Sequence, residues 1–284
     1  MSALRLPELW AGGRPLDEAG TATPRELEIA LNGPVGPQRL RADTQVFEGA
    51  GWYRTLTPSA SWPGANEVLF SRLDPLCPDT QIDAVVADYH RLGLPLTWCV
   101  YPWSQPADLG ARLLARGASV VSIEALLGST ALPLDIAEDV SVARIDASDA
   151  AAFDVFMDLM AGGYQLPPDE AQFRHCRYRH LASGDRPCLH LFVARYQDQP
   201  AGCAAMVLKP DSAHFTGDYV VKAYQARGVF QSLLAARMEA LRRLGIAHAT
   251  GHSNQQSAFW AKRFGFRPIY SYSIYQLDPP AAQA

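Results

Sequence analysis

The sequence lacks the cysteine pattern of a disulfide-rich or zinc-binding protein. Its five cysteines are scattered, odd in number and contain no CxxC pair: Cys77, Cys99, Cys176, Cys188 and Cys203. Closely spaced pairs are the usual mark of a structural zinc site, and an even set is typical of a disulfide framework. Neither kind of site is indicated, and the cysteines favour a reducing, cytoplasmic setting.

The chain also lacks long apolar runs and a basic surplus. No run approaches the roughly 18 residues of a membrane helix, and residues 1–15 have no long apolar segment of the secretory kind. Lys and Arg number 25 against 29 Asp and Glu, a net charge of −4. Nucleic-acid-binding domains usually carry a basic excess. We therefore expect neither a membrane nor a nucleic acid as a partner.

What the sequence has is enough apolar material for two domains. It holds 284 residues, 48% of them hydrophobic, and a typical domain takes about 150 residues. The segment 131–139 (ALPLDIAED), with its proline and acidic residues, is the best candidate linker. The prediction is a first domain over 1–134 and a second over 138–284.

Hydrophobic periodicity predicts an α/β (α+β) fold with one mixed sheet and helices on both faces. In the first half it indicates a helix at 80–92, a strand at 94–101, a helix at 106–116 and a strand at 119–127, whereas the first fifty residues show no sustained period. In the second half it predicts strands at 140–145, 189–195, 202–208, 213–221, 246–251 and 267–277. Helices are predicted at 149–160 (N-cap Ser148), 169–181, 228–244 and 255–264. Residues 94–127 and 245–277 both run strand, helix, strand, a weak internal repeat that suggests two halves of related architecture.

The most informative stretch is 219–234 (YVVKAYQARGVFQSLL), where a strand leads through a short loop into a long helix. The first turn of a helix exposes unpaired N–H groups and the positive end of the dipole, which together bind anions. Gly228 lets a phosphate approach the backbone, and Arg227 adds charge. The spacing is neither GxxxxGK[ST] nor GxGxxG. The loop therefore predicts a pyrophosphate site; the alternative is a surface helix start with an incidental arginine.

Over 140–277 the sequence resembles the GNAT superfamily of acyl-CoA N-acyltransferases. The family's Q/R-x-x-G-x-G/A loop falls on Gln225, Ala226, Arg227, Gly228, Val229 and Phe230, with Phe230 in place of the small final residue. Its second signature falls on Asn254, the helix that follows, and Gly265-Phe266. The first half resembles the degenerate copy of tandem members and has no comparable loop. The resemblance implies a tandem fold with acetyl-CoA as co-substrate and no metal.

The resemblance further implies which residues bind acetyl-CoA. A backbone N–H near Val220 or Val221 would polarise the thioester carbonyl. The predicted contacts are Val220, Val221, Lys222, Gln225, Ala226, Arg227, Gly228, Val229, Phe230 and Asn254.

Catalytic groups are sought on the strand that enters this loop. His214 shares alternation with Thr216, Asp218 and Val220, and in the family that face looks toward the acyl group and the amine. An imidazole titrates near neutral pH and can accept the amine's proton. His214 and Asp218 are therefore the candidate catalytic residues, against the alternative of ordinary strand side chains.

Two other features bear on the chemistry. Many family members carry a tyrosine, as the acid for the leaving thiolate, where this sequence has Ala261. His248 and His252 lie four apart, but no third ligand stands at a suitable spacing, so a packed or surface pair is favoured over a metal site.

The resulting hypothesis is an N-acetyltransferase that moves an acetyl group from acetyl-CoA to a small-molecule or peptide amine by direct attack. A homodimer is an assembly that the sequence allows. The alternatives are a non-catalytic acyl-CoA-binding or regulatory protein and a peptide or aminoacyl transferase of related tandem fold.

Overall fold

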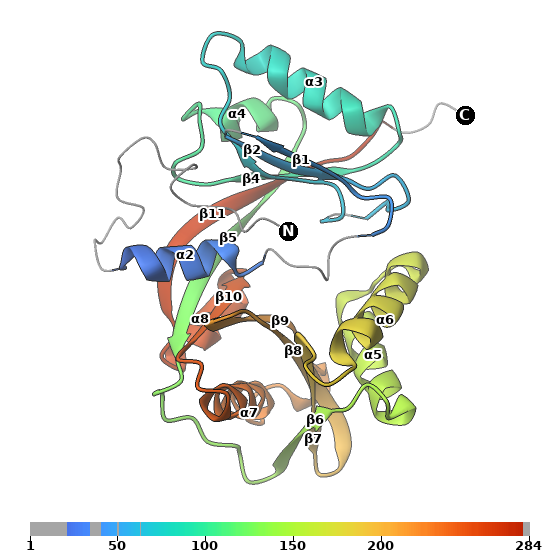
Figure 1. Ribbon diagram of the computed structural model, residues 1–284, viewed down its shortest axis with the longest axis vertical. Helices are drawn as coiled ribbons and strands as arrows, with labels where there is room; N and C mark the ends of the chain where they lie inside the picture. Colours follow the sequence, from blue (N-terminus) through green and yellow to red (C-terminus); the bar gives the residue numbers. More distant parts are fainter. Residues whose placement is uncertain (1–21, 35–40, 50, 63, 281–284) are drawn as a thin grey trace.

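A computed structural model describes residues 22–34, 41–49, 51–62 and 64–280 (Figure 1). The predictions made for residues 1–15 lie outside this part of the chain. The first half contains helices α2 (Pro24–Asn32), α3 (Pro78–His90) and α4 (Leu109–Leu114), and strands β1 (Gln45–Gly49), β2 (Trp52–Leu56), β3 (Glu67–Ser71), β4 (Leu96–Val100) and β5 (Ser119–Ser129). The second half contains strands β6 (Val140–Ile145), β7 (Leu189–Tyr196), β8 (Gln199–Leu208), β9 (Ser212–Val220), β10 (His248–Ser253) and β11 (Arg267–Leu277). Its helices are α5 (Ala150–Tyr164), α6 (Pro168–Ala182), α7 (Val229–Arg243) and α8 (Gln255–Arg263), with a 3₁₀ turn at Lys222–Tyr224.

The strands form one mixed sheet of eleven, in the order β1-β2-β3-β4-β11-β5-β10-β9-β8-β7-β6. The pairs β3–β4 and β9–β10 are parallel and the other neighbours are antiparallel. The predicted mixed sheet with helices on both faces is therefore confirmed.

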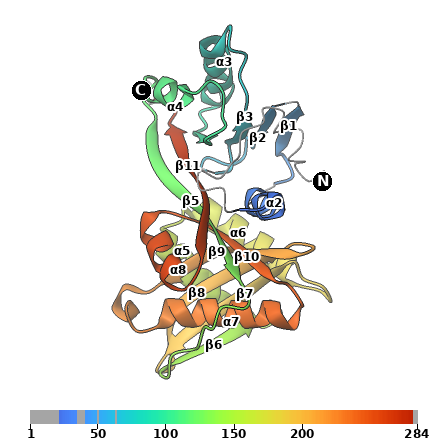
Figure 2. The same cartoon turned by 90° about the vertical axis from the view of Figure 1, so that its left-hand side faces the viewer.

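The two halves exchange their last strands. In the first half β11 lies between β4 and β5, and in the second half β5 lies between β10 and β11. The two exchanged strands pair antiparallel with each other, from Ser119 opposite Gln276 to Leu127 opposite Arg267. Both run as long curved strands between the halves (Figures 1 and 2). The predicted boundary at 134–138 thus divides the sequence into two halves, whereas one continuous sheet contains strands from both.

The internal repeat is visible in the order of elements. The run β3-α3-β4-α4-β5 repeats as β9-α7-β10-α8-β11, and each run begins with its parallel strand pair. In the first run, α3 begins at Pro78 after Cys77, with no side-chain cap.

In the second half, α7 and α8 cover one face of the sheet, and α5 and α6 cover the other. Helix α7 has an apolar stripe of Leu233, Leu234, Met238 and Leu241, all buried against the strands, whereas Leu244 after its last turn is exposed. One local prediction was wrong. The N-cap of α5 is Asp149, which accepts the Ala152 N–H at 3.1 Å, whereas the Ser148 hydroxyl donates to Asp146.

Helix α2 lies at the junction of the halves, on the sheet face opposite α7, and packs over the centre of the sheet. It begins with a capping box, in which Thr23 and Glu26 satisfy each other's backbone N–H groups. Glu26 also forms an ion pair with Arg267 of β11. The helix is thereby fixed above the strands that border the candidate site.

The segment 131–139 lies along α7. Arg242 Nε donates to Thr130 O at 2.7 Å, Gln231 Nε2 to Asp135 O at 3.1 Å, and the Ala137 N–H to Ser232 Oγ at 3.0 Å. The predicted linker is therefore docked over the whole length of the helix. None of the described helices is both long and apolar enough to cross a membrane.

Candidate active site

Strands β9 and β10 part midway along their length. Their parallel pairing runs from Ser212–His248 to Phe215–Gly251 and ends there. On the other side of β9, the register with β8 shifts opposite Gly217, whose φ is +67°. A bulge bends the strand that carries it. The bulge and the lost pairing together leave the later part of β9 with an edge that β10 does not cover.

The backbone of Val220 lies on this open edge. The Val221 N–H donates to Ala201 O of β8 at 2.9 Å. Successive N–H groups of a strand point to opposite edges, so the Val220 N–H points away from β8. Of the two predicted donors to a thioester carbonyl, Val221 is engaged within the sheet, and Val220 alone faces the parting.

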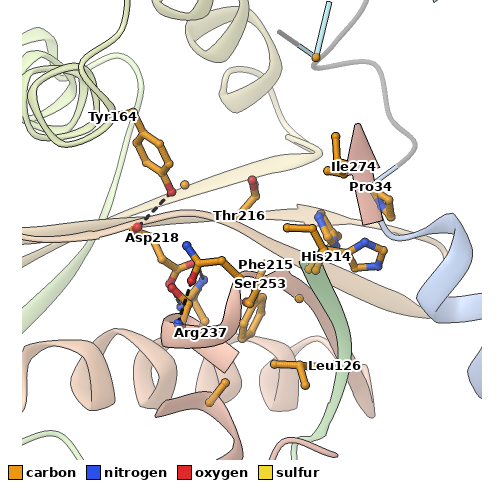
Figure 3. Close-up of a pocket in the computed structure, with 18 of the residues that line it drawn as sticks. Pro34, Leu126, Tyr164, His214, Phe215, Thr216, Asp218, Arg237, Ser253 and Ile274 are labelled. Atoms are coloured by element: carbon orange, nitrogen blue, oxygen red, sulfur yellow. Dashed lines mark hydrogen bonds and ion pairs between the residues drawn. The ribbon is translucent and has the colours of Figure 1, made fainter. Parts of the chain in front are cut away.

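A cavity of about 420 Å³ opens where the strands part (Figure 3). On the α7 side it is bordered by Phe230 and Leu234 of α7 and by Ala261 of α8. On the other side Trp62 and Phe173 contribute to its wall. The cavity thus joins the two faces of the sheet, and residues of both halves enclose it.

His214 and Asp218 both line the cavity, but from opposite faces of the sheet. The prediction that His214 and Asp218 point to the same face of β9 is wrong, because the bulge at Gly217 lies between them and reverses the alternation of side chains. His214 faces α2, where a Cβ on Gly33 would stand 2.8 Å from its Nδ1. Asp218 faces α7 and its Arg237 (Figure 3).

Arg237 of α7 is completely buried and forms an ion pair with Asp218. Its Nη1 donates to Asp218 Oδ2 at 3.1 Å and to Ala205 O of β8 at 3.3 Å, and its Nε donates to Leu233 O at 3.1 Å. The guanidinium also lies 4.1 Å from the centre of the Phe215 ring. Burial raises the pKa of Asp218, and Arg237 opposes this rise. The guanidinium therefore connects α7, β8 and the bulged part of β9.

The His214 ring is held by Thr250 of β10. Nδ1 lies 3.0 Å from Thr250 Oγ1, and that hydroxyl donates to Ala213 O at 3.4 Å. With the hydroxyl proton so used, His214 Nδ1 is the donor to Thr250. The His252 ring stands at 81° to His214, donates from Nε2 to Ala30 O at 2.9 Å and lies 3.0 Å from the Tyr272 hydroxyl. Both rings therefore have defined orientations.

The predicted phosphate loop follows β9 directly. Gly228 precedes α7 with φ +79°, and Ala226 has φ +60°. The first helical backbone bond of α7 runs from the Ser232 N–H to Gly228 O at 2.9 Å, as expected where a helix begins. Lys222, Gln225, Ala226 and Arg227 are exposed at this end of the helix.

Few of the residues predicted to bind acetyl-CoA line the cavity. Phe230 and Asn254 line the cavity, whereas Val220, Val221, Lys222, Gln225, Ala226, Arg227, Gly228 and Val229 are not among its lining residues. Asn254 caps α8, since its Oδ1 accepts the Ser257 N–H at 3.0 Å. A Cβ on Gly228 would lie 2.6 Å from Ala137 Cβ, so its substitution strains the fold as well as the loop.

The structure adds residues that the sequence reasoning missed. Tyr164 of α5 lines the cavity and donates its hydroxyl to Asp218 O at 3.0 Å. Arg237 had a signal, because it is a charged residue within the apolar stripe of α7. Trp62 is one of several aromatic residues of the first half whose sequence context favours packing over ligand binding, and only the fold brings its loop to the cavity. Ala261 is 6% exposed and faces the cavity, so the position of the family's tyrosine is a methyl group on the cavity wall.

Metal ligands do not gather in the described part of the chain. No group of three or more His, Cys, Asp or Glu side chains there could hold a metal ion. His252 is tied to Ala30 and Tyr272, as described above, so it belongs to a packed cluster.

Comparisons with known proteins agree with this fold. The profile of the acetyltransferase (GNAT) family matches residues 153–266. A functionally unknown conserved protein from Staphylococcus epidermidis superposes with a TM-score of 0.68 at 11% identity, over 87% of this chain and 98% of that one. A GCN5-related N-acetyltransferase from Kribbella flavida gives 0.58 at 13% identity, over 84% and 91%. A tandem GNAT protein from the clavulanic acid biosynthesis pathway gives 0.55 at 14% identity, over 90% and 89%. No curated protein matches the sequence.

Proposed function

This chain carries an acetyltransferase domain of the GNAT family over residues 153–266 in a tandem fold, and on that premise we propose that it transfers an acetyl group from acetyl-CoA to a primary amine. The observation that carries the proposal is the parting of β9 and β10. It leaves the Val220 N–H at an open edge, directly before the start of α7. The open edge would bind the thioester carbonyl of acetyl-CoA, and the start of α7 would bind the pyrophosphate of the same molecule.

The loop residues Lys222, Gln225, Ala226, Arg227, Gly228 and Val229 are proposed to hold the pyrophosphate. The backbone supplies N–H groups at the helix start, and Arg227, 5.9 Å from the centre of the Tyr196 ring, supplies charge. Val220, Val221, Phe230 and Asn254 are proposed to border the arm that carries the acetyl group.

The reaction is a direct attack. The amine nitrogen bonds to the carbonyl carbon, whose oxygen becomes negative and is stabilised by the Val220 N–H. The C–S bond then breaks, the amine loses its proton, and the thiolate leaves or is protonated. A thiol has an ordinary pKa of about 8.5, so the thiolate leaves tolerably at neutral pH without a dedicated acid. This makes the methyl group of Ala261 compatible with catalysis.

We assign the amine's proton to His214 rather than to Asp218. His214 lines the cavity, and its Nδ1 is already committed to Thr250, which fixes the ring. Both carboxylate oxygens of Asp218 are bonded to Arg237. Asp218 therefore acts by positioning the bulged strand, and His214 acts as the base.

A binding measurement tests the loop. Acetyl-CoA at a hundred times its dissociation constant stabilises a protein by about 2.7 kcal/mol. Arg227→Gln should weaken acetyl-CoA binding by about tenfold, because a hydrogen bond to a charged group is lost. Arg243→Gln, at the opposite end of the same helix, is the matched control and should bind normally. Equal affinity in the two variants would remove the loop from the proposal.

A non-catalytic acyl-CoA-binding protein is the second candidate, and Ala261 is the observation that favours it. It predicts tight binding of acetyl-CoA with no release of thiol in the presence of any amine.

A further inference from the structure

The far wall of the cavity is aromatic and is built by both halves. Trp62 comes from the loop between β2 and β3, and Phe173 comes from α6; their ring centres are 6.0 Å apart. The Arg41 guanidinium lies 5.1 Å from the centre of the Trp62 ring and 4.8 Å from that of Phe173. An arginine over an aromatic face attracts it electrostatically. The two rings are thereby fixed before any ligand arrives.

The polar groups beside this wall are already paired. Arg174 of α6 lines the cavity, and its Nε donates to Glu170 Oε1 at 2.8 Å. Glu170 is 5% exposed. Across the cavity, Asp218 is paired with Arg237. Among the lining residues that the structure describes, Asp218 is the only carboxylate, so none is left to neutralise an added positive charge.

We propose that the acceptor is a small primary monoamine with an aromatic body, which lies against Trp62 and Phe173 with its nitrogen toward the parting of β9 and β10. This inference rests on the proposed function and specifies its acceptor. A cavity of about 420 Å³, shared with the acetyl end of the donor, suits a small molecule better than a protein side chain on its backbone. Trp62 is 6% exposed and Phe173 is half-buried, and the area that these two rings present to the cavity is apolar, which suits an aromatic body better than a sugar.

The charge of the wall selects further. The attacking amine must be neutral, and a buried site without a spare carboxylate favours the neutral form. A polyamine or an aminoglycoside would bring further ammonium groups that find no uncommitted carboxylate among the described residues of this wall, because Glu170 and Asp218 are paired with Arg174 and Arg237. The wall therefore selects against polycations.

The test is a panel of amines with the full chain and acetyl-CoA, read as thiol release. The panel is 2-phenylethylamine, spermidine, kanamycin and a lysine-containing peptide. We expect kcat/KM for 2-phenylethylamine to exceed each of the others by roughly tenfold or more. Faster turnover of spermidine, kanamycin or the peptide would overturn the inference while the proposed function stands. No thiol release with any amine, although acetyl-CoA binds, would overturn the proposed function and the inference with it.

Variants locate the acceptor through KM and through a binding measurement that needs no turnover. Trp62→Ala should raise the KM for 2-phenylethylamine by roughly tenfold with little change in kcat, and Trp62→Phe should restore most of the loss. Phe47→Ala, an exposed aromatic of β1 outside the cavity, is the control and should leave KM unchanged. Titration calorimetry of 2-phenylethylamine should show the same loss of affinity in Trp62→Ala. Unchanged KM and affinity in that variant would place the acceptor elsewhere.

Discussion

Arg237 and Asp218 form an ion pair that bridges α7 to β9 directly after the bulge at Gly217. The guanidinium is completely buried, whereas the carboxylate side chain keeps 28% of its exposure. The pair therefore fixes the shape of the strand edge on which the proposed chemistry depends.

Removing one partner should be costly. Asp218→Asn leaves a buried guanidinium without its counter-charge, which costs about 3 kcal/mol of unfolding free energy. Adding Arg237→Met should cost less than the sum of the two single changes, with a coupling of about 1–3 kcal/mol, measured by denaturant unfolding. Strictly additive losses would show that the two side chains do not stabilise each other.

His214→Ala should lower kcat/KM by about a hundredfold and remove one ionisation from its pH profile, because the proposed base is removed. The affinity for acetyl-CoA should stay unchanged, since His214 lies apart from the loop. His180→Ala, an exposed histidine of α6, is the control and should behave as the unaltered protein. A pH profile that His214→Ala leaves unchanged would assign the proton to another group.

Local patterns predicted most elements but not their neighbours in the sheet. The bounds of β6 and β11 agree with the sequence because apolar β-formers end at turn residues there. Helix α2 was missed although Thr23-Pro24-Arg25-Glu26 is a capping-box pattern. The exchange of β5 and β11 could not be predicted, since alternation shows that a segment is a strand and not which strand it pairs with. The bulge at Gly217 likewise reversed the side assigned to Asp218.

The strand exchange predicts how a fragment behaves. A fragment of residues 138–284 lacks β4 and β5, so β10 loses one partner, β11 loses both of its partners, and unpaired edges are exposed. We expect it to aggregate, and co-expression with residues 1–137 to restore a soluble complex, measured by size-exclusion chromatography. A soluble and folded 138–284 fragment would show that the second half needs no strand from the first.

Glu26 should make the attachment of α2 sensitive to acid. Its hydrogen bonds with Arg267 and Thr23 lower its pKa to about 2 from an ordinary 4.5. A carboxyl with a lowered pKa stabilises the fold above its unfolded value, and this stabilisation is lost as pH falls from about 4.5 to 2. Glu26→Gln should cost on the order of 2 kcal/mol at pH 7 and almost nothing near pH 2. Glu28→Gln, on the same helix and paired with the exposed Arg25, is the control. A cost of Glu26→Gln that is constant across this range would contradict the assignment.

The most direct test of the account is the fate of the acetyl group. The full chain is incubated with acetyl-CoA and 2-phenylethylamine, thiol release is followed with a thiol reagent, and the amine is analysed by mass spectrometry. We expect one acetylated amine for each thiol released, and no release when the amine is omitted. Release of thiol without acetylated amine, or binding of acetyl-CoA with no release for any amine, would contradict the proposed function.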